Sequence, residues 1–218
     1  MSPPILRVSA APLCCVGIDV GGARKGFHAV ALRDGALAGQ LHSRDPEELA
    51  AWCRQSVEAG LIAIDAPSRW SPDGRMRPCE RELLAEGIRC FASPTREQAI
   101  DHPSNYFGWM LRGEALYDAL EPSHPRCRGL PLQGPLCFET FPHAITWQLR
   151  GGGADAGRKR EQRSELLREA GIALGTLTSI DWIDAALCAL AAQRLAAGQP
   201  CRVYGEPISG LILVPANA

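Results

Sequence analysis

Two short apolar runs that each meet an aspartate constrain this fold more than any other feature of the sequence. The first, Cys14–Val20, is interrupted by a single acid at Asp19. The second, Leu61–Ile64, leads directly into Asp65. Apolar runs of this length are typical of strands that are buried on both faces. An ionised carboxylate in such a place must be hydrated, paired or bound to a metal ion.

The residues between these runs predict the order of the first elements. Further apolar runs at Gly26–Leu32 and Ala36–Leu41 flank Asp34-Gly35, and an Asp-Gly pair between apolar runs is a strong signal for a hairpin. Three antiparallel strands are therefore expected. Asp45-Pro46-Glu47-Glu48 then supplies an N-cap acid and a proline at the first helical position. The strand ending at Asp65 completes a βββαβ order.

This order brings the two aspartates together if the first and fourth strands are adjacent and parallel. Asp19 and Asp65 would then lie side by side at one edge of the sheet. Two such carboxylates repel each other unless a cation lies between them.

The rest of the chain predicts an insertion and then further strands and helices. Residues 66–136 are rich in proline, arginine and aromatic residues, with helices expected near 79–86 and 106–120, and we interpret them as an insertion over the core. Beyond them the patterns predict a strand at 136–139, a helix running to Leu149, helices at 166–170 and 181–197, and short strands at 201–204 and 211–214. The whole chain, residues 1–218, is expected to form one α/β domain.

The last predicted helix carries two acids on one face near its N-terminus. Asp181 and Asp184 are three residues apart. Asp184 lies close to the apolar stripe that contains Leu187 and Ala191, so it is expected to point toward the sheet. Asp181 could reach a metal ion, or it could simply stabilise the helix dipole.

Acids from separate elements suit a metal centre for phosphodiester chemistry. Mg²⁺ and Mn²⁺ prefer carboxylate and water oxygens, and a pair of these ions can stabilise both the attacking and the leaving oxygen. The sequence predicts Asp19, Asp65 and Asp184 as the principal ligands of Mg²⁺ or Mn²⁺ and as catalytic residues, with Asp181 and Glu139 in support. For Glu139, a structural ion pair with a nearby arginine is an open alternative.

Basic side chains near the acids are candidates for contacts with a nucleic-acid backbone. Four arginines follow Asp65 closely: Arg69, Arg75, Arg77 and Arg81. We take Arg69 and Arg77, together with Lys159 from a second basic cluster, as candidate substrate-binding residues, and Trp70 could stack a base there. A solvated surface rich in arginine explains the same pattern.

Composition limits the classes of protein. The formal net charge of −1 argues against a protein that coats nucleic acid non-specifically, although it does not exclude a nuclease. The nine cysteines are odd in number and form no CxxC pair, which favours reduced thiols. The chain has no apolar run long enough to span a bilayer, and its opening MSPPILRVSAAPL lacks an apolar signal core. No membrane association and a cytoplasmic location are expected.

Five short motifs together point to a known family. They are Gly17-Ile18-Asp19, Ala63-Ile64-Asp65-Ala66-Pro67, Arg77-Pro78-Cys79-Glu80, Glu139-Thr140-Phe141-Pro142 and Asp181-Trp182-Ile183-Asp184-Ala185. As a set, over roughly residues 16–215, they resemble the domain-of-unknown-function family 429, described as predicted ribonuclease-H-like nucleases.

The resemblance implies a ribonuclease-H-like core, which is a mixed sheet in βββαβαβα order, here with a helical insertion between the fourth and fifth strands. It also implies kinship with RuvC-type resolvases, whose final helix carries two acids at the spacing of Asp181 and Asp184. Those resolvases that act on symmetric junctions are dimers, which leaves a homodimer open. Fold alone does not establish function.

Three hypotheses for function follow. The first is a metal-dependent nuclease or phosphodiesterase that hydrolyses nucleic acid. The second is a phosphotransferase, because Gly17-Ile18-Asp19-Val20-Gly21-Gly22 is similar to the phosphate-binding hairpin of actin-like ATPases and sugar kinases. The third is a non-catalytic module that binds nucleic acid or protein through the arginine-rich insertion.

Overall fold

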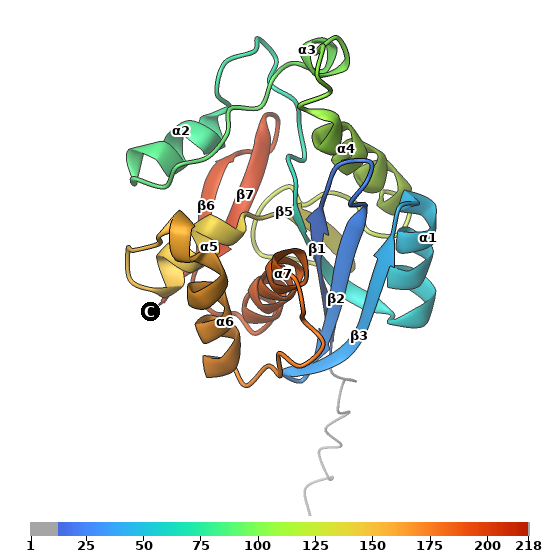
Figure 1. Cartoon of the computed structure of the whole chain (residues 1–218), viewed down its shortest axis with the longest axis vertical. Coiled ribbons are helices and arrows are strands. Elements are labelled where there is room, and N and C mark those ends of the chain that lie inside the picture. The colour runs from blue at the N-terminus through green and yellow to red at the C-terminus, as the bar shows by residue number, and fades with distance from the viewer. Residues whose placement is uncertain (1–12, 218) are drawn as a thin grey trace, which may run out of the picture.

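The computed structural model describes residues 13–217 (Figure 1). The expectation that the chain lacks a signal peptide concerns an opening segment that lies almost entirely outside this range. In the described part of the chain, no helix has the length and apolar character needed to cross a membrane.

The N-terminal strands form an antiparallel meander. Strands β1 (Cys14–Val20), β2 (Phe27–Arg33) and β3 (Ala36–Ser43) pair in sequence order, as predicted. Asp34 and Gly35 connect β2 to β3 with φ values of 51° and 77°. These left-handed values are the ones that a two-residue hairpin of the Asp-Gly type requires.

A capped helix leads from the meander back into the sheet. In α1 (Pro46–Ala51) the Asp45 side chain accepts a hydrogen bond from the Glu47 N–H at 2.9 Å, as the sequence predicts for an N-cap. The helix continues as a π-helical stretch at Trp52–Ser56 and is followed by β4 (Ala59–Asp65).

The remaining elements follow the predicted order closely. They are α2 (Pro78–Ala85), α3 (Arg96–Ile100), α4 (Gly108–Leu120), β5 (Leu136–Glu139), α5 (Pro142–Leu149), a 3₁₀ turn at Ala156–Arg158, α6 (Lys159–Glu169), α7 (Ile180–Ala196), β6 (Cys201–Glu206) and β7 (Gly210–Pro215). The short α3 was not predicted. It begins with a capping box in which Gln98 N–H donates to Thr95 Oγ1 at 3.2 Å and Thr95 N–H donates to Gln98 Oε1 at 2.9 Å.

The strands form one mixed sheet of seven strands in the order β3-β2-β1-β4-β5-β7-β6. Strands β1, β4, β5 and β7 are parallel to one another, while β2 is antiparallel to β1 and β6 is antiparallel to β7. The domain is therefore mixed α/β, with its central strands parallel and both ends of the sheet antiparallel.

Helices cover both faces of this sheet. Helix α7 lies across one face over β1, in the foreground of Figure 1, with α5 and α6 beside it. Helices α1 and α4 lie on the other face, where Leu49 and Leu116 join the apolar cluster that includes Val16, Ile18 and Ile64. Each face has its own buried hydrophobic core.

Helix α7 packs against β1 without an intervening side chain. A Cβ atom added to Gly17 would lie 2.1 Å from the carbonyl oxygen of Ala185 and 2.1 Å from the backbone nitrogen of Ala189. Only glycine permits this approach. It places the N-terminal turns of α7 over the carboxyl end of β1.

We therefore expect Gly17→Ala to destabilise the fold by at least about 3 kcal/mol, because both atoms in the way belong to the backbone of α7 and cannot rotate aside. Urea denaturation measures the loss. The control is Gly175→Ala, where an added Cβ meets nothing within 4 Å. Equal midpoints for the two variants would contradict this account of the packing.

Candidate functional site

The centre of the candidate site is a pair of aspartates on neighbouring parallel strands. Asp19 of β1 lies directly opposite Asp65 of β4 in the register of the sheet, as the sequence predicts. Gly17 and Ala63, two residues earlier on each strand, pack on the α7 side, and side chains on one face recur every second residue. Both carboxylates therefore face α7.

Neither carboxylate of this pair has a partner in the part of the chain that the structure describes. Within residues 13–217, no hydrogen bond or ion pair involves the side chain of Asp19 or Asp65. Both side chains are only partly exposed to solvent. Two partly buried, unpaired acids side by side are unfavourable unless a proton or a cation neutralises them.

Helix α7 contributes two more acids, and each is held by a basic side chain. Asp184 is buried and forms an ion pair with Arg163 of α6. Asp181, in the first turn, pairs with Lys25 Nζ at 2.8 Å. With all four aspartates ionised, these two cations leave the cluster with a formal charge of −2, which is the charge that one divalent ion neutralises.

The acids raise one another's pKa values. Burial raises the pKa of Asp19 well above its usual range, and the charges of Asp65 and Asp184 raise it further. Burial and the charge of Asp184 raise the pKa of Asp65 to about 8, against the opposing effect of Arg163. The pKa of Asp184 is also raised by burial, although Arg163 opposes this. In the absence of a bound cation, the pair therefore favours a protonated state.

This shift makes the stability of the metal-free protein depend on pH. A carboxyl whose pKa is raised from 3.8 to about 8 on folding stabilises the fold fully below about pH 4, and this contribution is lost as the pH rises through 8. We expect the free energy of unfolding, measured in urea with chelator, to fall between about pH 5 and about pH 8. In the Asp65→Asn variant, which mimics the protonated acid, the free energy of unfolding should fall less steeply with pH. An equal slope in both proteins would contradict the raised pKa of Asp65.

The donor set fits a divalent metal only in part. Among residues 13–217, no group of three or more histidine, cysteine or acidic side chains is already arranged to hold a metal ion. Asp184 and Asp181 are not arranged with Asp19 and Asp65 as ligands because their carboxylates pair with Arg163 and Lys25. The unpartnered oxygens of Asp19 and Asp65 are nevertheless the hard ligands that Mg²⁺ and Mn²⁺ prefer.

Glu139 lies apart from this pair. In the register of β4 and β5 it is opposite Ile64, one residue before Asp65, so alternation directs its side chain to the other face of the sheet. There its carboxylate accepts hydrogen bonds from Arg77 Nη2 at 2.6 Å and Arg77 Nη1 at 3.0 Å. It also accepts from the N–H and the hydroxyl of Ser68 at 2.8 and 2.9 Å. The arginine ion pair that the sequence left open is present.

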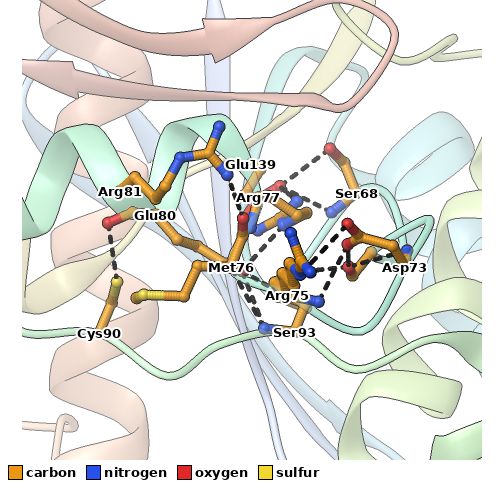
Figure 2. A network of polar contacts seen from close by, with 12 residues as sticks. Ser68, Asp73, Arg75, Met76, Arg77, Glu80, Arg81, Cys90, Ser93 and Glu139 are labelled. Atoms are coloured by element: carbon orange, nitrogen blue, oxygen red, sulfur yellow. Dashed lines mark hydrogen bonds and ion pairs between the residues drawn. The ribbon is translucent and has the colours of Figure 1, made fainter.

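Figure 2 shows that this ion pair belongs to a larger buried network. Arg77 is 2% exposed, and its Nε donates to Glu80 Oε1 at 2.8 Å. Glu80 also accepts a hydrogen bond from the Ser93 hydroxyl at 2.6 Å. Every side-chain nitrogen of Arg77 is occupied, so the guanidinium is not available for the substrate contact that the sequence suggested.

Breaking this network should destabilise the protein. Arg77→Met leaves Glu80 and Glu139 buried without a countercharge, and we expect a loss of about 3 to 5 kcal/mol in the free energy of unfolding. The matched control is Arg75→Met, because the Arg75 side chain is 86% exposed and should contribute about 1 kcal/mol or less. Thermal or urea unfolding of both variants measures the two losses in the free energy of unfolding. A small effect at Arg77 would show that the network is not structural.

The other two candidate substrate-binding residues are exposed. Arg69 lies in the loop that follows β4, and Lys159 is the first residue of α6. The charge of Lys159 lowers the pKa values of both Asp65 and Asp184, so it acts on the acid cluster.

Three residues of the site were given no role in it by the sequence, although Arg163 belongs to the basic cluster that contains Lys159. Lys25 and Arg163 pair with acids far away along the chain, and no local pattern indicates such pairs. His28 lies directly opposite Asp19 in the register of β1 and β2, and its Nδ1 is buried without a hydrogen-bond partner. Its position within the apolar run Gly26–Leu32 was the one available signal, because a polar residue interrupts that run as Asp19 interrupts the first.

The fold and the site together define an α/β protein with a carboxylate cluster at the carboxyl end of its central parallel strands. The chain belongs to the family described as "Protein of unknown function (DUF429)", which it matches over residues 17–208. This membership confirms the resemblance seen in the motifs, and the matched range contains every acid of the cluster. Comparisons with curated proteins and with solved structures gave no match.

Proposed function

We propose that the protein is a metal-dependent nuclease or phosphodiesterase that hydrolyses nucleic acid. The observation that carries this proposal is the pair formed by Asp19 and Asp65, which are in register, face α7 and have no partner within residues 13–217. Buried acids without partners are costly for stability, and a cation-binding role accounts for them.

The strand arrangement supports the same proposal. An antiparallel β1-β2-β3 meander followed by parallel β4 and β5 is the order expected of a ribonuclease-H-like core. In this interpretation, residues 66–136, with α2, α3 and α4, are an insertion between the fourth and fifth strands.

Each residue of the cluster has a distinct part in the proposal. Asp19 and Asp65 would hold Mg²⁺ or Mn²⁺, and Asp184 would be the third ligand if its carboxylate turned away from Arg163. The ion would supply Lewis acidity toward the phosphate and lower the pKa of a water molecule. Arg163 would then be available for a phosphate oxygen, for which a planar guanidinium is well suited.

The supporting acid and the lysines adjust the charge of the site. Asp181, held by Lys25, keeps negative charge at the rim of the cluster without joining the ligands. Lys159 is exposed and near enough to shift the pKa of Asp65, so it can contact the substrate backbone. We further expect the protein to work in a reducing compartment such as the cytoplasm, because all nine cysteines are free thiols.

The phosphotransferase hypothesis finds less support. In the β1–β2 connection, Gly21 N–H donates to the Gly26 carbonyl at 2.9 Å, and Lys25 and Gly26 N–H donate to the Gly22 carbonyl at 3.0 and 2.9 Å. These amides are used within the turn itself, so they are not free to bind a phosphate.

We expect purified protein to cleave labelled oligonucleotides with Mg²⁺ or Mn²⁺ and not with chelator. Asp19→Asn and Asp184→Asn should each lower the rate by more than about 100-fold, since losing even an outer partner of a metal ligand commonly lowers activity by 10- to 100-fold. The panel should include single-stranded, duplex, hybrid and junction substrates. Rates are compared at equal concentrations of folded protein.

The matched control is Asp34→Asn in the β2–β3 turn, where asparagine tolerates the left-handed φ of 51°. It should cleave at the wild-type rate. Calorimetric titration with Mn²⁺ alone gives a second readout, and binding should be lost in Asp65→Asn. Cleavage by Asp19→Asn at the wild-type rate, or unchanged Mn²⁺ affinity in Asp65→Asn, would refute the proposal.

A further inference from the structure

An exposed group of aromatic side chains lies between β4 and β5 in the chain. Phe91 is 66% exposed and Tyr106 is 52% exposed, while His102 and Phe107 are half-buried. The ring centroids are 4.9 Å apart for Tyr106 and Phe107, 5.8 Å for His102 and Tyr106, and 6.4 Å for Phe91 and Tyr106. These four rings form one continuous surface, which we call the aromatic surface.

A contiguous patch of exposed apolar side chains is typical of a binding site. The rings of Phe91 and Tyr106 are flat and open to solvent, and the Tyr106 hydroxyl donates no hydrogen bond to a neighbour in the described chain. Trp70, which the sequence suggested for base stacking, is instead half-buried and donates its Nε1–H to Glu114 at 2.7 Å. The residues free to stack a ligand are therefore Phe91 and Tyr106.

One residue of the aromatic surface, Phe91, lies at a small cavity that also reaches the candidate site. This cavity of about 60 Å³ is lined by Phe91 and Asp65, and also by Arg77, Glu80 and Glu139 of the buried network. In Figure 1, α3 and the start of α4 rise beyond the end of the sheet at which β1 finishes. Phe91 and Asp65 line the same cavity, so a ligand that stacks on Phe91 lies next to the candidate site.

Charge near Phe91 suits a phosphate backbone. Arg89, two residues before Phe91 in the chain, is exposed. Within residues 13–217 Arg89 takes part in no ion pair. On the other side of the aromatic surface, Asp101 is exposed next to His102, so phosphate contacts belong on the Phe91 side.

We propose that the aromatic surface stacks unpaired bases, and that the substrate is nucleic acid with single-stranded nucleotides next to the cleaved bond. This inference rests on the proposed function and specifies its substrate class. Bases that are paired within a duplex have their faces covered by their neighbours, whereas an unpaired base offers its face to an aromatic ring. Both DNA and RNA present this chemistry.

The test is fluorescence anisotropy of full-length protein with chelator present, so that binding is measured without cleavage. The probes are labelled single-stranded DNA, single-stranded RNA and a blunt duplex of equal length. Wild type should bind a single strand more tightly than the duplex. Phe91→Ala and Tyr106→Ala should each weaken single-strand binding by about 5- to 100-fold, and Phe91→Trp should preserve it.

Leu84→Ala is the control, because Leu84 is an aliphatic residue of α2 that is 49% exposed and lies outside the aromatic surface. Its affinity should equal that of wild type, and all variants should melt like wild type. Unchanged single-strand affinity in both aromatic variants, or tighter binding of the duplex, would overturn the inference. Tighter binding of either single strand, DNA or RNA, than of the duplex supports it and identifies the preferred strand.

The two proposals fail in different ways. If single strands bind through Phe91 and Tyr106 but Mn²⁺ never produces cleavage, hydrolysis is wrong and the stacking surface stands. If wild type and both aromatic variants cleave every substrate at equal rates, hydrolysis stands and the stacking surface is wrong. Well-folded protein that binds no nucleic acid at all overturns the stacking inference and favours a protein partner.

Discussion

The close packing of α7 on β1 is the constraint on which the rest of the structure depends. Because Gly17 has no side chain, the helix backbone rests directly on the strand backbone. This contact fixes both the height and the rotation of α7 over the sheet. Asp184, on the buried side of the helix, is thereby held over the end of β1 and near Asp19. A single residue without a side chain sets the geometry of acids from separate elements.

Two groups of acids near the ends of the central strands are neutralised in opposite ways. In the buried network, Glu80 and Glu139 share Arg77, and their carboxylate oxygens are saturated with donors. On the α7 face, Asp19 and Asp65 have no donor within residues 13–217, and the nearest cations pair with other acids. A saturated network stabilises one conformation, whereas an unsaturated pair stores electrostatic energy that a ligand can release. Only the second arrangement is suited to binding a cation.

The sequence was informative where the signals are local. Turn residues such as Asp34 and Gly35 predicted the meander, and the apolar runs that meet Asp19 and Asp65 predicted that these acids lie side by side if their strands are adjacent and parallel. The sequence did not indicate which cations pair with the acids. Lys25 and Asp181, for example, are 156 residues apart and meet only in the tertiary fold. Glu139 ends a strand just as Asp65 does, yet a register offset of one residue turns it to the opposite face. Register between parallel strands is set by packing rather than by local pattern.

The buried network also has a mechanical consequence. Its bonds run in series from Ser93 through Glu80, Arg77 and Glu139 to Ser68, which lies three residues beyond Asp65. The segment carrying Ser93 is also the one that carries Phe91 two residues earlier. Because these bonds join the segment that carries Phe91 to the loop after β4, we expect a displacement of one segment to be coupled to a displacement of the other.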